Sequence, residues 1–219
     1  MALQIEVIPV GPFQANACIV IDDVARRAVI VDPGAEGDAL AARVRQSGLT
    51  LDAIWVTHGH LDHVGGIAGV RRAFPTVPIW LHAADRPLYD GSPMQARAYG
   101  IPFEAPPAPT DAWVEGDTVS IGEHRFQVMH LPGHAPGHVA LVGDDVVFVG
   151  DVIFAGSIGR TDLPFCDPRA MQHSLARIAT WPPALALYPG HGETTTVGAE
   201  VQTNPFLQGL ARPRGASTP

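Results

Sequence analysis

An apolar strand that runs directly into a dense group of metal-ligand side chains is the feature that most constrains this chain. Residues 53–63 read AIWVTHGHLDH, and their second half holds four potential ligands. His58 and His60 lie two positions apart at the end of an extended segment, so they point to the same side, and the glycine between them permits a tight turn. Asp62 and His63 begin the helix that follows, so the change of chain direction aims them at a neighbouring position. The segment therefore predicts ligands for two metal ions.

Two metal ions need more ligands than one segment supplies, and three later loops carry suitable side chains. Each loop follows a predicted strand: His134 in LPGH, Asp151 in FVGD and His191 in LYPGH. A carboxylate has two oxygens and is a natural bridge between two cations, which suits Asp151, while neutral imidazoles suit borderline metals such as zinc. A single histidine after a strand is usually structural, but this combination indicates a binuclear site. The remaining histidines are expected to be structural, with His130 and His138 as candidates to contact the ligands: His82, His124, His130, His138 and His173.

The predicted elements fall into two successive halves, each with several strands and at least one helix. Strands are predicted at 4–10, 17–21, 28–31, 53–56, 78–82, 117–121, 125–130, 138–142, 146–150 and 184–187, and helices at 38–46, 61–74 and 168–180. Residues 83–112 are expected to form short helices and a proline-rich loop. Two sheets packed face to face with helices outside would bring the polar loops to one edge, which places the chain in the α/β (α+β) class. Residues 1–211 are predicted to form a single domain, and residues 212–219 a disordered tail.

Composition and charge exclude several classes of protein. Apolar residues make up 46% of the 219 residues and charged residues 16%, which predicts a folded chain with a substantial core. All 14 basic residues are arginines, they occur as scattered singles and pairs, and the net charge is −8. No basic patch for nucleic acid is therefore expected. Without lysine the chain also has no Schiff-base nucleophile and no Walker motif.

The N-terminus and the cysteines bear on the cellular compartment. The opening MALQIEVIPV lacks a basic segment followed by an apolar one, and no apolar stretch approaches membrane-spanning length. Cys18 and Cys166 have no metal-type spacing and are expected to be buried structural thiols in a reducing compartment. The sequence therefore predicts a cytoplasmic protein with no nucleic-acid or membrane partner, and it defines no oligomeric state.

Taken together, the motifs resemble those of the metallo-β-lactamase superfamily, and in particular its small single-domain relatives of glyoxalase II. The matching segments are THGHLDHVGG at 57–66, the PGH loops at 132–134 and 189–191, GD at 150–151, VDPG around Asp32, GSIGRTDLP at 156–164 and NPFLQ at 204–208. The resemblance implies a four-layer αββα sandwich. It also implies one metal on His58, His60 and His134 and a second on Asp62, His63 and His191, with Asp151 as the bridge, Asp62 and Asp151 as catalytic residues, and Asp32 behind the ligands.

A site of this kind favours hydrolysis. Two cations that share a water lower its pKa toward neutrality, create a hydroxide nucleophile and stabilise the oxyanion formed at a carbonyl. A thiol leaves as a thiolate with a pKa of about 8.5 and needs little help, so a small thioester fits a site with no evident extra acid. The expected function is therefore that of a thioesterase of glyoxalase II type, acting on S-acyl glutathione or related small thioesters. Zinc is the expected metal, and the same ligands accept iron or manganese.

Substrate recognition is expected to be only partly like that of full-length glyoxalase II. Arg160 matches a basic substrate contact of that family. The C-terminal helical domain that supplies further basic contacts to glutathione is expected to be absent, because the segment after His191 is short. The sequence therefore predicts a weakened glutathione site.

Other activities share this scaffold. The GRTD segment at 159–162 also resembles that of persulfide dioxygenases, in which a single iron is held by two histidines and an aspartate. The PGHGETT segment at 189–195 favours the hydrolase instead. A promiscuous β-lactamase or lactonase is a weaker alternative, because β-lactamases of this superfamily usually lack an aspartate where Asp151 stands. A non-catalytic metal-binding module is the weakest, since every ligand position is filled.

Overall fold

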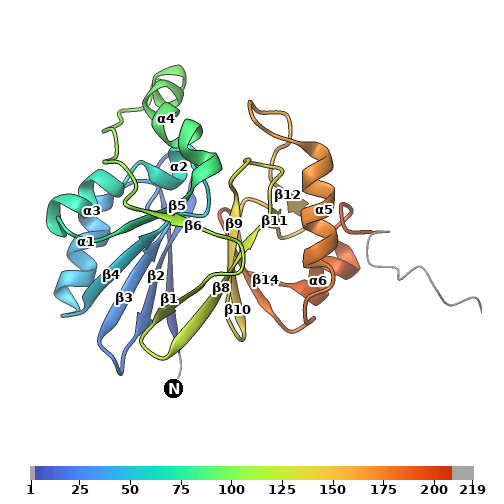
Figure 1. The fold of residues 1–219 in the computed structure, drawn as a ribbon, viewed down its shortest axis with the longest axis horizontal. Coiled ribbons are helices and arrows are strands. Elements are labelled where there is room, and N and C mark those ends of the chain that lie inside the picture. The colour runs from blue at the N-terminus through green and yellow to red at the C-terminus, as the bar shows by residue number, and fades with distance from the viewer. Residues whose placement is uncertain (1–2, 209–219) are drawn as a thin grey trace, which may run out of the picture.

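Two six-stranded β-sheets face each other in the computed structural model, which describes residues 3–208 (Figure 1). The first sheet has the order β1–β2–β3–β4–β5–β6: β1 (Gln4–Val10), β2 (Ala15–Asp22), β3 (Arg27–Val31), β4 (Thr50–Trp55), β5 (Ile79–His82) and β6 (Asp111–Trp113). Its first three strands pair antiparallel, and β3 to β6 are parallel.

The second sheet has the order β14–β13–β10–β9–β8–β7. Its strands are β7 (Thr118–Ile121), β8 (His124–His130), β9 (Val139–Val142), β10 (Val146–Gly150), β13 (Ala186–Pro189) and β14 (Thr195–Thr196). All pair antiparallel except β10 with β13. A small ribbon of β11 (Ile153–Phe154) and β12 (Ser157–Ile158) follows β10.

Helices cover the outer face of each sheet (Figure 1). Those of the first half are α1 (Gly37–Gln46), α2 (Leu61–Val64), α3 (Ile67–Ala73), the 3-10 turn η1 (Ala83–Asp85) and α4 (Arg86–Ala98), and those of the second are α5 (Pro168–Ile178) and α6 (Val197–Thr203). The α5 helix begins where the side chain of Asp167 accepts hydrogen bonds from the amides of Arg169 and Ala170, with proline at the first helical position. The four-layer sandwich predicted from the sequence is confirmed. No helix within residues 3–208 is long and apolar enough to cross a membrane.

The described residues form three hydrophobic cores, and alternation along the strands separates the first two. In β2, Ala17 and Ile19 join the core beneath the outer helices, whereas Cys18 and Val20 join the core between the sheets. Successive strand side chains point to opposite faces, so a strand covered on both sides is apolar at every position. The inter-sheet core includes Trp55 with the rings of Trp113 and Phe126 packed edge-on against it. A third core lies beneath α5.

The two cysteines differ in environment. Cys18 is buried as predicted, and burial raises the pKa of its thiol well above the ordinary value. Cys166 is only partly buried, so the expectation that both thiols are buried is wrong for this residue. Its Sγ lies 3.0 Å from the carbonyl oxygen of His134, beside the predicted ligands.

Several elements differ from the sequence prediction. The predicted 61–74 helix is interrupted at Gly65-Gly66, where the Gly66 amide donates to the carbonyl of Pro33 (2.7 Å) instead of to the preceding helical turn. The 83–112 segment contains the short 3-10 turn η1 and one longer helix, α4, of 13 residues, rather than short helices only. Pro93 lies inside this helix and provides no N–H, and the carbonyl of Tyr89 accepts a hydrogen bond from the Ser92 hydroxyl instead (2.7 Å).

Short elements escaped the prediction altogether. These are β6, β11, β12, β14 and α6, most of them two or three residues long. Their pairing depends on partners elsewhere in the chain rather than on a local pattern. The predicted tail at 212–219 lies outside the described residues, as does the end of the predicted 1–211 domain.

Candidate metal centre

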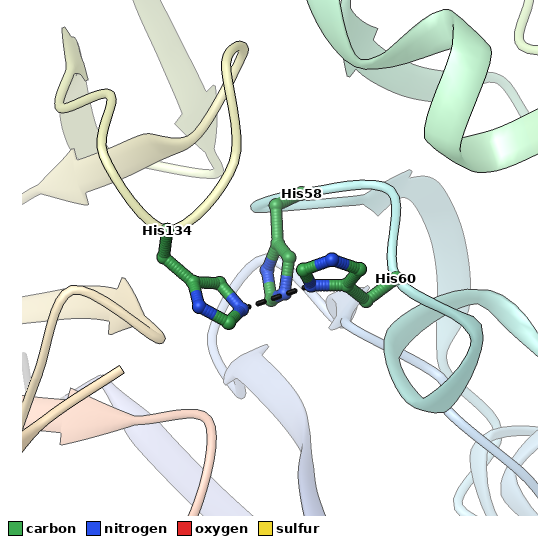
Figure 2. A group of neighbouring side chains, drawn as sticks. All are labelled: His58, His60 and His134. Atoms are coloured by element: carbon green, nitrogen blue, oxygen red, sulfur yellow. Dashed lines mark hydrogen bonds between the residues drawn. The ribbon is translucent and has the colours of Figure 1, made fainter. Parts of the chain in front are cut away.

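The seven predicted ligands meet at the edge where both sheets end. His58, His60, Asp62 and His63 follow β4, and His134 lies in the β8–β9 loop. Asp151 directly follows β10, and His191 lies two residues after the end of β13. The donor atoms of His58, His60 and His134 all lie within 4.8 Å of one another, and so do those of Asp62, His63 and His191. Figure 2 shows the first three rings converging from two different loops. We refer to these seven side chains as the donor cluster.

Asp151 lies between the two groups of three. Its Oδ1 is 3.4 Å from His63 Nε2, and its Oδ2 is 3.5 Å from His134 Nε2 and 3.6 Å from His191 Nε2. Asp62 Oδ2 is 3.3 Å from His191 Nε2. Asp151 therefore reaches donors of both groups. This is the arrangement expected of a carboxylate that bridges two cations.

Unpartnered polar atoms show that the cluster fits metal ions. Of the buried side-chain nitrogen and oxygen atoms in residues 3–208 that have no hydrogen-bond partner, three belong to the cluster: His58 Nε2, His63 Nε2 and Asp151 Oδ1. Each such atom costs about 1–3 kcal/mol of folding free energy when it is left unpaired. Imidazole nitrogens and carboxylate oxygens that converge in this way are the donor set of zinc and of similar divalent metals.

Hydrogen bonds behind the cluster orient the rings. His134 Nδ1 donates to the carbonyl of Arg160 (2.8 Å), and His63 Nδ1 donates to Asp32 Oδ2 (3.0 Å). The hydroxyl of Thr57 donates to the same Asp32 oxygen (2.6 Å) and accepts from His58 Nδ1 (3.1 Å). In its neutral form with Nδ1 protonated, each of these three rings presents the lone pair of Nε2 to the cluster.

Electrostatics in the cluster also favour cations. Burial by itself would raise the pKa of Asp151, but the nearby histidines, His63 first, hold it well below its ordinary range. Burial would likewise lower the pKa of His63, yet the carboxylates of Asp151 and Asp62 raise it well above its usual value. Burial and the neighbouring His134 lower the pKa of His60 to about 4, which keeps this ring neutral, as a metal ligand must be.

The loop that carries His191 passes close to the donor cluster at Gly190. A Cβ at this position would lie 2.1 Å from Asp151 Oδ1 and 2.6 Å from His63 Cε1. Only a residue without a side chain lets the backbone before His191 pass so close to the donors.

Two residues that position the loops were missed by sequence reasoning. The buried carboxylate of Asp85 accepts hydrogen bonds from Gly59 N (2.8 Å), between His58 and His60, and from Gly137 N in the loop that carries His134. Burial raises the pKa of Asp85 to about 6. Asn16 Nδ2 donates to the carbonyls of Pro189 (3.0 Å) and Gly192 (2.9 Å), on either side of His191. No local pattern marks either residue, because their partners are 26 to 176 residues away.

The two histidines considered as outer contacts differ. His138 Nε2 accepts a hydrogen bond from the amide of Asp151 (3.0 Å), and its ring stacks on His58 at 4.8 Å. His130 bonds to the carbonyl of Pro136 (2.8 Å) and stacks on His82, so it supports the loop rather than a donor.

A cavity of about 620 Å³ opens directly over the donor cluster. His60, Asp62, His134, Asp151 and His191 form its floor. Arg160, the predicted substrate contact, lines the wall, but its Nε and Nη2 are bonded to both carboxylate oxygens of Asp162 at 2.8 and 2.9 Å. This guanidinium is therefore already paired.

A four-layer sandwich with histidines and aspartates gathered where its two sheets end has the architecture of a metal-dependent enzyme. The family model described as Metallo-beta-lactamase superfamily matches residues 10–191, so the chain belongs to this superfamily. Hydroxyacylglutathione hydrolase GloC of Haemophilus influenzae is 38% identical over 211 residues, which cover 94% of this chain and 98% of GloC.

Solved structures agree with this placement. BLEG-1 B3 metallo-beta-lactamase has a TM-score of 0.87 at 36% identity and covers 94% of this chain and 100% of its own. TTHA1623, solved in a di-iron-bound form, has a TM-score of 0.84 at 44% identity and covers 92% of this chain and 100% of its own. The superfamily predicted from the motifs is confirmed, and the histidine–aspartate cluster indicates divalent metal ions.

Proposed function

We propose that the protein is a binuclear metal-dependent hydrolase of small thioesters, including S-acyl glutathione. The observation that carries the proposal is the donor cluster, in which two groups of three side chains share Asp151 beneath an open cavity. The proposed ligands are His58, His60 and His134 for one ion and Asp62, His63 and His191 for the other, with Asp151 as the bridge. When bound, two divalent ions supply Lewis acidity, which lowers the pKa of a shared water and polarises the carbonyl.

The chain's own groups fit a thioester better than an amide. In hydrolysis the water oxygen bonds to the acyl carbon, the C–S bond breaks, and the sulfur leaves with the electron pair as a thiolate. Outside the donor cluster, the titratable side chains that line the cavity are Tyr99 and Arg160. A phenol and a guanidinium are poor proton donors at neutral pH, whereas a thiolate with a pKa of about 8.5 leaves without one. The similarity to GloC, which is named as a hydroxyacylglutathione hydrolase, supports the same choice.

Metal reconstitution with a substrate panel tests this proposal. The protein is stripped with a chelator, reloaded with zinc, iron(II) or manganese, and assayed with S-lactoylglutathione and with S-acetyl-N-acetylcysteamine. We expect metal-dependent thioester cleavage together with two bound ions per chain. Oxygen uptake with glutathione persulfide, one iron per chain and no thioester cleavage would instead identify a persulfide dioxygenase.

A second candidate function is β-lactam hydrolysis. It is favoured by the similarity to BLEG-1, described as a B3 metallo-beta-lactamase, at 36% identity over 94% of this chain. A chromogenic cephalosporin added to the same panel tests it. Turnover of the cephalosporin faster than of any thioester would replace the thioesterase proposal.

Replacing Arg160 with alanine should have only a small effect on glutathione thioesters. Its side chain is 61% exposed and paired with Asp162, so a substrate carboxylate must compete for it. Exposed ion pairs are worth about 0.2–1 kcal/mol, so we expect KM for S-lactoylglutathione to rise by at most about fivefold with kcat nearly unchanged. Steady-state kinetics measure this, with the N-acetylcysteamine thioester as the control. A rise in KM of a hundredfold would show that Arg160 is a main recognition residue.

A further inference from the structure

The walls of the cavity over the donor cluster are strongly apolar. They come from the β1–β2 loop, α4 and its C-terminal end, β11, and the loop before α5, and they include Phe13, Leu88, Met94, Tyr99, Phe154 and Phe165. Its volume of about 620 Å³ lies in the range of small-molecule sites. The donors that form the floor also hold the proposed reaction centre, so the apolar walls surround whatever part of a substrate extends from its reacting carbonyl.

Exposed apolar side chains gather at the mouth of this cavity. Met94, Phe165 and Tyr99 are 73%, 61% and 56% exposed, and Phe13 packs its ring edge-on against Tyr99 at 5.3 Å. Eight large apolar side chains in residues 3–208 are exposed, and these four all line this one cavity. Single exposed apolar residues are common on protein surfaces, but a group of them around a concave opening marks a binding site.

The walls of the cavity offer few charged partners to glutathione. Glutathione has two carboxylates and an ammonium group, and Asp62 and Asp151 on the floor are proposed ligands of the metal ions rather than contacts of the thiol portion. Apart from histidines, Arg160 is the one cationic side chain among the described lining residues, and it is bonded to Asp162. An exposed ionic contact changes affinity by at most about fivefold. Each methylene that is buried changes it by about fourfold, so even a short alkyl chain outweighs that contact.

We propose that this cavity binds an apolar acyl group, and that the preferred substrates are thioesters of medium-chain or aromatic acids, such as octanoyl or phenylacetyl thioesters. This inference rests on the proposed thioesterase function and specifies its substrate class. The acyl chain lies along the apolar walls, while the polar thiol portion reaches solvent through the open mouth. The nature of the thiol, glutathione or another, contributes little to recognition.

Binding of non-hydrolysable thioethers tests the proposal without relying on turnover. The set crosses two alkyl groups, methyl and octyl, with two thiols, glutathione and N-acetylcysteamine, and calorimetry measures Kd for each. With either thiol we expect the octyl compound to bind at least about a hundredfold more tightly than the methyl compound, because each buried methylene contributes about fourfold. Exchange of the thiol should change Kd by less than about fivefold. An effect of the thiol larger than that of the alkyl chain overturns the proposal.

A matched pair of variants locates the binding surface. Met94→Glu places a carboxylate at the mouth, and Val24→Glu makes the same change at an exposed position in the turn between β2 and β3. Both side chains are mostly exposed, so both variants should fold. We expect Met94→Glu to reduce the octyl-to-methyl affinity ratio by about tenfold, which is the loss of one to two methylenes' worth of apolar contact. Val24→Glu should keep the wild-type ratio. If the octyl-to-methyl affinity ratio were the same in both variants and in the wild type, the alkyl group would bind outside this cavity.

Kinetics of the metal-loaded protein separate this inference from the proposed function. We expect kcat/KM to rise from acetyl through hexanoyl to octanoyl thioesters. Thioester cleavage that is independent of acyl length would overturn the cavity inference and leave the thioesterase function standing. Tight octyl binding without cleavage of any thioester would overturn the thioesterase function while the cavity's apolar preference holds.

Discussion

An Asp151→Ala variant should lose at least one bound metal ion and nearly all hydrolytic activity while keeping its fold. Asp151 reaches donors of both ligand groups, with Oδ1 3.4 Å from His63 Nε2 and Oδ2 3.5 Å from His134 Nε2. We expect kcat/KM to fall by at least about a thousandfold, which corresponds to ~4 kcal/mol of transition-state stabilisation. The fold should persist because the three apolar cores lie away from this edge.

Metal content per chain, thioester kinetics and circular dichroism measure these effects. Asp144→Ala is the matched control, since Asp144 is an exposed aspartate in the turn that precedes the same strand, β10, at its opposite end. The control should keep wild-type metal content and activity. If Asp151→Ala retained two metal ions and normal turnover, the bridging role would be wrong.

An Asp85→Ala variant should be strongly destabilised and should bind metal more weakly. The change removes a carboxylate that accepts hydrogen bonds from Gly59 and Gly137, and both amides would be left buried without a partner. Each unpaired buried donor costs about 1–3 kcal/mol, so we expect a loss of about 3 kcal/mol in the free energy of unfolding. For a chain of this length this lowers Tm by about 6–12 °C. Residues that orient ligands from behind typically change metal affinity by about 10- to 100-fold.

Thermal unfolding and metal titration well below the Tm of the variant measure the two effects separately. Asp90→Ala is the control, because Asp90 is an exposed aspartate on α4 whose partner is the surface residue Arg86. That exposed pair is worth at most about 1 kcal/mol, so Tm should change little. A destabilised Asp85→Ala variant with wild-type metal affinity would show that Asp85 supports the fold but does not position the ligand loops.

The sequence by itself determined the architecture and the composition of the donor cluster. Apolar runs of alternating or continuous type predicted most of the long strands, because burial on one or both faces of a sheet leaves a local pattern. The residues at 58–63 are close together in the chain, and the other three predicted donors each follow a strand. Where strands of two facing sheets end at the same edge, the side chains that follow them are brought together, so these motifs predicted a common site.

Tertiary structure alone decided how that cluster is held and what surrounds it. Asp85 and Asn16 bond to backbone amides and carbonyls of distant loops, and such partners leave no signal in neighbouring residues. The strands β11, β12 and β14 are too short for a periodic pattern and exist because a partner strand is adjacent.

The surroundings of the reaction centre were likewise invisible in the sequence. Arg160 was predicted as a substrate contact because it matches a basic contact of the family it resembles, but the fold pairs it with Asp162. Phe13, Met94 and Phe165 come from three separate segments and belong to no motif, yet they meet at one opening. A sequence pattern reflects how a residue packs within its own helix or strand. The shape of a cavity depends instead on the distances between elements, and only packing of the whole chain sets those distances.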